Sequence, residues 1–332
     1  MAIASGLAAQ IGVAAESTYG TYVAPTRFVE YNKADLKKKK NVVQGGGLAA
    51  GRIAQLGSRR VVTSESVEGG FELEVANKGM GLLLAHLLGS SATPVQQGAT
   101  AAYLQAHTVG DNIGKSLTIQ HGVPDLTGTV RPYTFMGCKL SGAELSCKVD
   151  ELLTMSLDID GRQASEVETL VAASLATGVA PFHWAQMSVK LGTFGAEAAV
   201  SGVKGFSVKF DRGMASERFY AGAAPYLKAE PVMNDWLKVS GSLDVDLVDK
   251  ADFADRFAAD SATSLVIEFV GPLIASTYYQ TFRIKVPMVF FDGDTPTVDG
   301  PDVTSGGYPF VAQLDGTNPL VSIDYISTDT TL

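Results

Sequence analysis

The sequence is poor in the residues from which metal centres and catalytic sites are built. Only 2 cysteines and 4 histidines occur among its 332 residues. The histidines stand apart from one another and from both cysteines, so no ligand spacing typical of zinc is present, and no serine lies in a nucleophile-elbow pattern. Four aspartates within residues 292–302 lack the bidentate glutamate of an EF-hand and are interpreted as turn residues. We therefore expect no metal, no cofactor and no enzymatic activity.

Basic charge and long apolar runs are also scarce. The 26 lysines and arginines are outnumbered by 35 acids, which gives a net charge of −9, whereas a protein that coats DNA presents a basic face. This balance excludes a DNA-coating protein but does not exclude DNA as a neighbour. The longest apolar run, Met80–Leu88, is interrupted by His86 and is too short to span a bilayer. No lysine or arginine precedes Arg27, so the basic region of a signal peptide is missing, and we expect cytoplasmic assembly without a membrane.

The two cysteines lie on either side of a possible turn. Cys138 and Cys147 flank Gly142-Ala143, and a two-residue turn there would place them opposite each other on a hairpin. A cross-strand disulfide is then conceivable, but two buried thiols are the favoured interpretation in a cytosolic setting.

Glycine and β-forming residues are abundant. The chain has 35 glycines and many Val, Thr and Ser runs, which favour short strands joined by turns. A hydrophobic content of 46% with 18% charged residues excludes general disorder. The length suits two domains or one large one.

One stretch of the sequence occurs in two versions. In Val67–Gly89, apolar and acidic residues alternate as in a strand with one buried face, and a helical pattern then ends at Gly89. In Gly241–Ser261 the same alternation is followed by Asp249-Lys250 and a short helical pattern that carries two phenylalanines. Each version therefore predicts a strand, a hinge and a short helix.

The segments that follow the two versions also match. Ser116–Ile119 corresponds to Ser264–Ile267, 148 residues further on, and Thr134-Phe135 corresponds to Thr281-Phe282, 147 residues further on. We predict an internal duplication of a β-rich unit with one short helix. The alternative is two unrelated strand–helix–strand runs, since the copies match in pattern more than in identity.

The beginning of the chain carries a family resemblance. The run Glu16-Ser-Thr-Tyr-Gly-Thr is followed by Pro25 and by a predicted strand at Arg27–Tyr31, and Tyr133–Gly161 contains three strand-like runs. This pattern resembles the major tail tube proteins of long-tailed, siphovirus-like bacteriophages over Glu16–Gly161, and it returns more weakly in Pro181–Leu314.

The resemblance implies a structural virion protein of the tail. Such a subunit would form rings that stack into a tube, and DNA would pass through the lumen without specific binding. Its implied partners are other copies of itself, a tape-measure protein, a tail terminator and a distal tail protein. Assembly would take place in the cytoplasm of the bacterial host.

Residues 33–60 are expected to form a long irregular loop rich in lysine and glycine. Four adjacent lysines cannot be buried unpaired, and the glycines do not form a dinucleotide loop because no βαβ alternation surrounds them. The loop is interpreted either as a solvated segment or as an inter-subunit contact that reaches an acidic surface of the next copy; tail tubes commonly use such a loop between rings. Its candidate contact residues are Lys37, Lys38, Lys39, Lys40, Arg52, Arg59 and Arg60.

Two acidic stripes are candidates for a lumen lining. Glu72 and Glu74 in one version, and Asp244 and Asp246 in the other, alternate with buried residues and so project from one strand face. They are either ordinary polar residues of a solvated sheet or the wall of a channel. A like-charged wall would repel DNA phosphate and let a duplex slide.

We therefore predict a mainly β fold built from a duplicated β-sandwich or half-barrel unit, each copy with one short helix. The first unit spans residues 1–165 with an N-terminal arm, a connector spans 166–180, and the second unit spans 181–332. Two copies per chain predict a trimeric, pseudo-sixfold ring, with a hexamer as the alternative. Alternative functions are a carbohydrate-binding surface protein, with Tyr220, Tyr226 and Trp236 as its platform, and another virion part such as a neck or capsid decoration protein.

Overall fold

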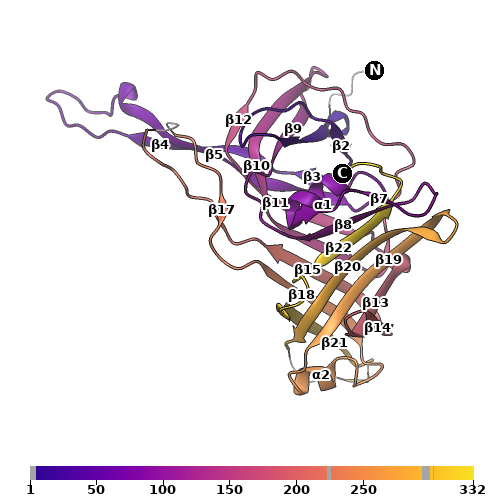
Figure 1. The fold of residues 1–332 in the computed structure, drawn as a ribbon. Coiled ribbons are helices and arrows are strands. Elements are labelled where there is room, and N and C mark those ends of the chain that lie inside the picture. The colour runs from indigo at the N-terminus through magenta and orange to yellow at the C-terminus, as the bar shows by residue number, and fades with distance from the viewer. Residues whose placement is uncertain (1–4, 223–225, 294–299, 302) are drawn as a thin grey trace.

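The computed structural model describes residues 5–222, 226–293, 300–301 and 303–332. Within these residues the chain forms 22 strands and 2 α-helices, which confirms the mainly β fold (Figure 1). Asp294, Asp299 and Asp302, three of the aspartates interpreted as turn residues, lie outside this part of the chain.

The elements of the first half run from the N-terminus to residue 165. They are β1 (Gln10–Glu16), β2 (Arg27–Val29), β3 (Lys33–Ala34), β4 (Lys37–Gln44), β5 (Arg60–Glu74), α1 (Gly81–Leu88), β6 (Gly89–Ser91), β7 (Val95–Gln96), β8 (Tyr103–Val109), β9 (Ser116–Pro124), β10 (Val130–Lys148), β11 (Thr154–Gly161) and β12 (Gln163–Ser165).

The elements of the second half follow a connector. They are β13 (Met187–Thr193), β14 (Ala196–Ala199), β15 (Val203–Asp211), β16 (Met214–Ala215), β17 (Val232–Met233), β18 (Lys238–Asp246), α2 (Ala254–Ala258), β19 (Thr263–Ala275), β20 (Tyr278–Phe291), β21 (Ser305–Ala312) and β22 (Ser322–Ser327).

The main strands of the two halves pair in the same order. In the first half the order is β2-β1-β9-β10-β11-β5-β4, and in the second half it is β14-β13-β19-β20-β21-β18-β15, with every pair antiparallel. Each helix follows the corresponding strand, α1 after β5 and α2 after β18. The equivalent strands also match residue by residue. Phe71 on β5 pairs with Leu157 on β11, and Leu243 on β18 pairs with Tyr308 on β21. Glu72 and Asp244, each one residue further along, therefore occupy equivalent positions in the two halves.

A strand ladder joins the two halves. The second part of β10, Gly142–Lys148, pairs along its whole length with Gly205–Asp211 of β15. On its other edge the same part of β10 pairs with β11. One continuous sheet therefore runs β4-β5-β11-β10-β15-β18-β21-β20 through both halves (Figure 1).

The core follows the alternation seen in the sequence. Phe71, Leu73 and Val75 are buried, and α1 buries most of its apolar side chains before it ends at Gly89, whose φ of 88° suits glycine. The helix predicted after Asp249 is shorter than expected: α2 begins after Phe253, which is buried against Tyr308 with ring centroids 5.2 Å apart.

The pairing of β10 confirms the favoured interpretation of the two cysteines as buried thiols. No turn exists at Gly142-Ala143, because both edges of β10 are paired there and the strand runs straight through. Cys138 and Cys147 therefore lie on one strand as buried free thiols, and burial raises the pKa of Cys147 to about 11. The N-terminal segment finds its neighbours within its own chain, because β1 lies between β2 and β9 and buries its apolar residues.

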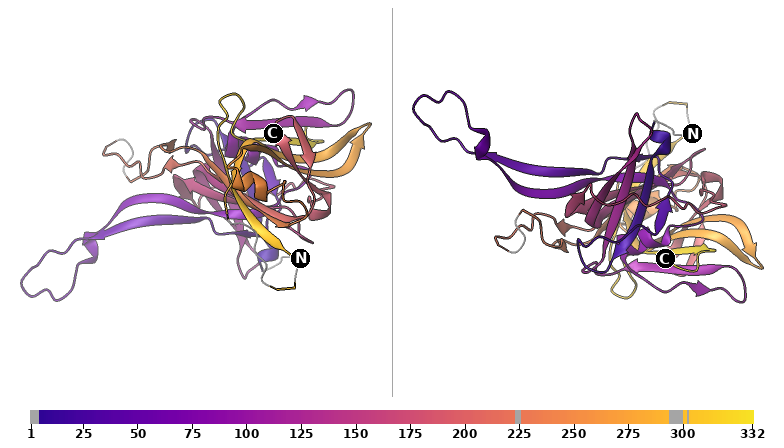
Figure 2. Two further views of the ribbon diagram at one scale, coloured as in Figure 1. Left: turned by 90° about the horizontal axis from the view of Figure 1, so that it is seen from below. Right: turned by 90° about the horizontal axis from the view of Figure 1, so that it is seen from above.

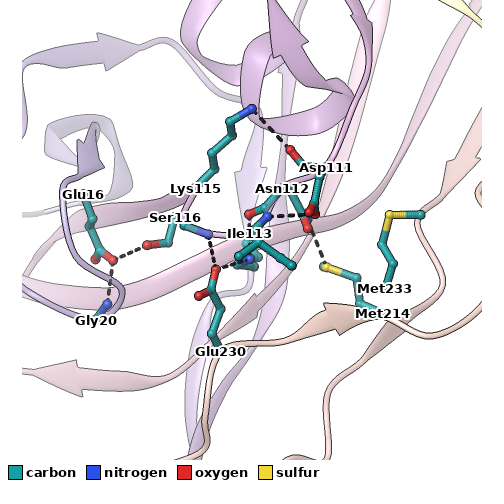
Figure 3. A network of polar contacts seen from close by, with 12 residues as sticks. Glu16, Gly20, Asp111, Asn112, Ile113, Lys115, Ser116, Met214, Glu230 and Met233 are labelled. Carbon is teal, nitrogen blue, oxygen red and sulfur yellow. Dashed lines mark hydrogen bonds and ion pairs between the residues drawn. The ribbon is translucent and has the colours of Figure 1, made fainter. Parts of the chain in front are cut away.

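The glutamate of the opening motif ties three segments together. Glu16 is buried, and its carboxylate accepts hydrogen bonds from the Gly20 amide at 2.8 Å and the Ser116 hydroxyl at 2.6 Å (Figure 3). Its other oxygen accepts from the Thr118 hydroxyl at 2.9 Å and the Gly137 amide at 2.8 Å. Four donors around one carboxylate explain why an acid stands at the start of the motif.

We predict that Glu16→Gln destabilises the fold by about 3 kcal/mol, because an amide has one acceptor oxygen and leaves two of the four donors without an acceptor. Chemical denaturation of the monomer measures the change. Glu30→Gln, at an exposed position, is the matched control and should leave the midpoint unchanged. Equal midpoints for the two variants would show that the Glu16 network does not stabilise the fold.

Candidate subunit interfaces and lumen surface

The continuous sheet has one polar face that crosses both halves. Directly opposed residues of antiparallel strands share a face, so the registers trace a row from Glu72 through Ser156, Glu144 and Lys209 to Ser240. Neighbouring rows are made of glycine, serine, threonine and charged residues, and a shallow groove of about 330 Å³ lies over part of them between Glu144 and Asp244. This face is hydrophilic from β5 to β18, and its row continues on β21 and β20 with the apolar residues Val311 and Phe290.

The four acids proposed for the lumen lie on this face. Glu72, Glu74, Asp244 and Asp246 alternate with residues that are buried in the core. The face is not uniformly acidic, however, because Lys33 lies 2.8 Å from Glu72 and Lys204 lies 2.8 Å from Asp246. The hydrogen bond to Glu72 raises the pKa of Lys33. The surface therefore combines acids with lysine partners.

The lysine run is not in an irregular loop. Lys37–Gln44 forms β4, which pairs with β5, and of residues 33–60 only 35–36 and 45–59 lack a strand. Acids on β5 make this possible: Lys38 lies 2.7 Å from Glu65, and Lys39 lies 2.9 Å from Glu68. The hydrogen bond from Lys39 lowers the pKa of Glu68. The charges that argued for a solvated loop are thus partly neutralised across the ladder.

Residues 40–65 form a projection that we call the hairpin arm. It stands off the body of the molecule in all views (Figures 1 and 2). Arg52, Arg59 and Arg60 are exposed on it, and Lys40 has no carboxylate within ion-pair distance in the described part of the chain. Leu48 and Ile53 are fully exposed near its tip. An isolated monomer gives this arm little to pack against.

Residues 212–237, of which the structure describes 212–222 and 226–237, contain a second projection, which we call the crossing arm. It connects β15 to β18, just as the hairpin arm connects the equivalent strands β4 and β5. Both arms leave the body on the same side (Figure 2). Unlike the hairpin arm, it lies against its own chain, since the Glu65 amide donates to the Tyr226 carbonyl at 2.7 Å. Tyr220, Tyr226 and Trp236 are exposed on it.

Buried charges hold the crossing arm on the first half. The Lys139 ammonium is fully buried, lies 2.5 Å from Glu230 and donates to the Asn112 carbonyl at 2.7 Å. Glu230 also accepts from the Gly114 amide at 2.6 Å, and Figure 3 shows it below that loop. Lys228 pairs with Asp160 of β11, and burial lowers the pKa of Lys228 to about 8.

An arginine anchors the root of the crossing arm. Arg212 is fully buried, and its guanidinium donates to the Leu87 and Gly110 carbonyls, each at 2.7 Å. Leu87 lies in the last turn of α1, where carbonyls lack helical partners and cations are stabilised. The arm of the second half thereby caps the helix of the first half.

Comparison with known proteins decides the class of this molecule. The sequence matches the phage tail tube protein family over residues 6–317, nearly the whole chain. The chain belongs to the phage tail tube family. It is therefore a structural subunit of a phage tail that assembles with copies of itself into a tube. No curated protein matches it.

The family also explains what was not found. In the described residues, no three metal-binding side chains lie close enough together to hold an ion, and no helix has the length and hydrophobicity needed to cross a membrane. What a tail tube protein needs instead are sheet edges and arms that other copies can bind.

Sequence reasoning missed the buried cations of the junction. Lys139 stands in an otherwise apolar strand, between Cys138 and Leu140, and a charge at such a position indicates a buried partner. Arg212 follows directly on β15 and gave no comparable signal. Their partners lie far away in the sequence, so only the folded chain identifies them.

We predict that Lys139→Met releases the crossing arm, because Glu230 loses its cation while Met fills the space. The cost should lie near the low end of the ~3–5 kcal/mol typical of broken buried pairs, because Glu230 keeps some contact with water. Limited proteolysis should cut within residues 212–237 at least tenfold faster than in the unmodified chain. Lys148→Met, at an exposed position on the same strand, is the control, and equal cleavage rates for both variants would contradict the prediction.

Proposed function

We propose that three copies of this tail tube subunit close into a pseudo-sixfold ring, with a true hexamer as the alternative. The observation that carries the proposal is the shared strand order of the two halves. Six equivalent units are then supplied by three chains, divided into a first unit at residues 1–165, a connector at 166–180 and a second unit at 181–332. The rings stack into the tail tube of a long-tailed phage.

The internal junction supports a specific way of closing the ring. Inside the chain, the edge of β15 pairs with β10 of the preceding half. In the first half, the edge equivalent to that of β15 belongs to β3 and β4. In the described residues, these two strands pair with β5 alone, so their other edge is open. An exposed strand edge is a template for another chain, and closure into a ring removes it. We infer that the β4 edge receives the second half of the neighbouring copy, near the end of β20.

The polar face of the continuous sheet suits a lumen through which DNA passes. Between β5 and β18 its small and charged side chains offer no aromatic surface on which bases could stack, and Lys33 and Lys204 are paired with acids. Glu74 and Asp244 add negative charge that repels phosphate. A duplex would therefore slide along this wall without specific binding.

Family membership also suggests the other partners. A tape-measure protein would occupy the lumen during assembly, a tail terminator would bind one end of the tube, and a distal tail protein would bind the other. The subunit would be made and assembled in the host cytoplasm and would act in the virion without catalysing a reaction.

The mass per unit length of purified tubes tests the stoichiometry. Three chains of 34.8 kDa in each ring are expected, and scanning transmission electron microscopy of unstained tubes together with the ring spacing measures the number. Six chains in each ring would remove the argument from the repeated strand order and leave the hexamer.

Replacement of Lys37, Lys38, Lys39 and Lys40 by serine tests the role of β4 in assembly. We expect a folded monomer, because the pairs of Lys37 and Lys39 with Glu68 are exposed and contribute only about 0–1 kcal/mol each, so that the partly buried Lys38–Glu65 pair carries the main cost. Assembly should weaken and become less sensitive to salt, since the charge facing the next subunit is gone. Turbidity and electron microscopy across a salt series measure both effects, and tubes of normal length and salt resistance would mean that these lysines are only solvated.

A further inference from the structure

The two arms are counterparts in length as well as in position. The hairpin arm lies between Lys39 and Ser66, which pair with each other, and the crossing arm lies between Asp211 and Lys238, which also pair. Each arm contains 26 residues. Positions in one arm can therefore be matched to positions in the other by counting from either end.

The surface under the crossing arm also has a counterpart. In the first half, one row of paired residues crosses β5, β11 and β10 at Glu68, Asp160 and Lys139. In the second half, the equivalent strands are β18, β21 and β20, and the equivalent row consists of Ser240, Val311 and Phe290. Asp160 thus corresponds to Val311, and Lys139 corresponds to Phe290.

The two rows differ in chemistry. The crossing arm covers the first row with matching charges, Lys228 on Asp160 and Glu230 on Lys139. The second row offers no charge at the corresponding positions: Val311 is 36% exposed and Phe290 is half-buried. Apolar side chains on an otherwise polar sheet face indicate a surface that another apolar segment covers.

The hairpin arm has the matching character. Lys238 and Ser66 are the equivalent residues at the ends of the two arms. Lys228 lies ten residues before Lys238, and Leu56 lies ten residues before Ser66, so Lys228 corresponds to Leu56. By the same count Glu230 corresponds to Ser58. The crossing arm therefore has charged residues at the two positions that face the charged row, and the hairpin arm has the uncharged Leu56 and Ser58 at the equivalent positions.

We propose that the hairpin arm of one copy lies across the second half of the neighbouring copy in the same ring, with Leu56 over Val311 and Phe290. The proposal rests on the proposed ring. Within the chain, the crossing arm extends from β15, and β15 pairs with β10 of the first half. The crossing arm also lies over β10, since Glu230 contacts Lys139. This arm therefore covers the same half to which its strand is paired. The hairpin arm, which extends from β4, accordingly crosses the half that closes on the β4 edge.

The free conformation of the hairpin arm agrees with this assignment. It projects from the body as a two-stranded ladder, while the crossing arm runs back over the first half (Figures 1 and 2). Leu48, Ile53 and Leu56 are exposed in the single chain. Burial of such side chains removes apolar surface from water and therefore favours ring closure.

A charge exchange tests the contact. In the full chain, Val311→Asp should reduce tube assembly at least tenfold, because it places an unpaired carboxylate against an apolar arm. Leu56→Lys should do the same. The double variant recreates the Lys228–Asp160 pair of the internal junction between two chains, so assembly should recover and become salt-sensitive. Val311→Thr, similar in shape and uncharged, is the control and should assemble. Electron microscopy and sedimentation quantify tubes, and circular dichroism checks that each monomer is folded.

Normal tubes from Val311→Asp would overturn the contact, as would a double variant that assembles no better than either single variant. Either result leaves the tube function intact if the unmodified chain assembles. Failure of the unmodified chain to form tubes would instead contradict the proposed function.

A cross-linking experiment separates contacts within a ring from contacts between rings. Leu56→Cys and Val311→Cys in one chain should form an intermolecular disulfide in assembled tubes, and both native cysteines are buried and will not compete. Complete oxidation should give a ladder on a denaturing gel that ends at three chains, or at six if the ring is a hexamer. A ladder that continues beyond six would place the arm on the next ring and overturn the assignment, as would no cross-link.

Discussion

The ladder between β10 and β15 is the interaction on which the rest of this structure depends. A β-strand with an open edge leaves backbone groups that must find partners, and here Gly142–Ser146 has both edges filled, by β11 on one side and β15 on the other. Two sandwich-like units become one sheet through these backbone bonds. The polar face, the position of both arms and the free edge at β4 all follow from this pairing.

The charged contacts around this ladder add selectivity to it. Lys139, Arg212 and Lys228 are buried, and burial lowers the pKa of each, because each cation loses hydration that the groups around it must replace. Buried pairs of this kind contribute little net stability but penalise a wrong partner strongly. The second half of a chain is thereby favoured on its own first half over a foreign apolar surface.

The sequence revealed the local elements and missed much of their pairing. The alternation around Phe71 and the glycine after α1 predicted the strand and the helix end, because these depend on neighbouring residues. Gly142-Ala143 has the composition of a turn, yet pairing on both sides keeps β10 extended there. Lys37–Lys40 has the composition of a solvated loop, yet Glu65 and Glu68 on the opposite strand stabilise it as β4. In both cases the deciding partners are distant in sequence.

The connector at residues 166–180 has a kinetic consequence. Because it tethers the two units, their junction forms at a high effective concentration during the folding of a single chain, whereas a junction between chains depends on the subunit concentration in the cell. Half of the contacts in a pseudo-sixfold ring would then exist before any two molecules meet. In the proposed ring, subunits would then wait as monomers whose main open edge is β4, and the timing of tail growth would depend on the nucleation of the first ring.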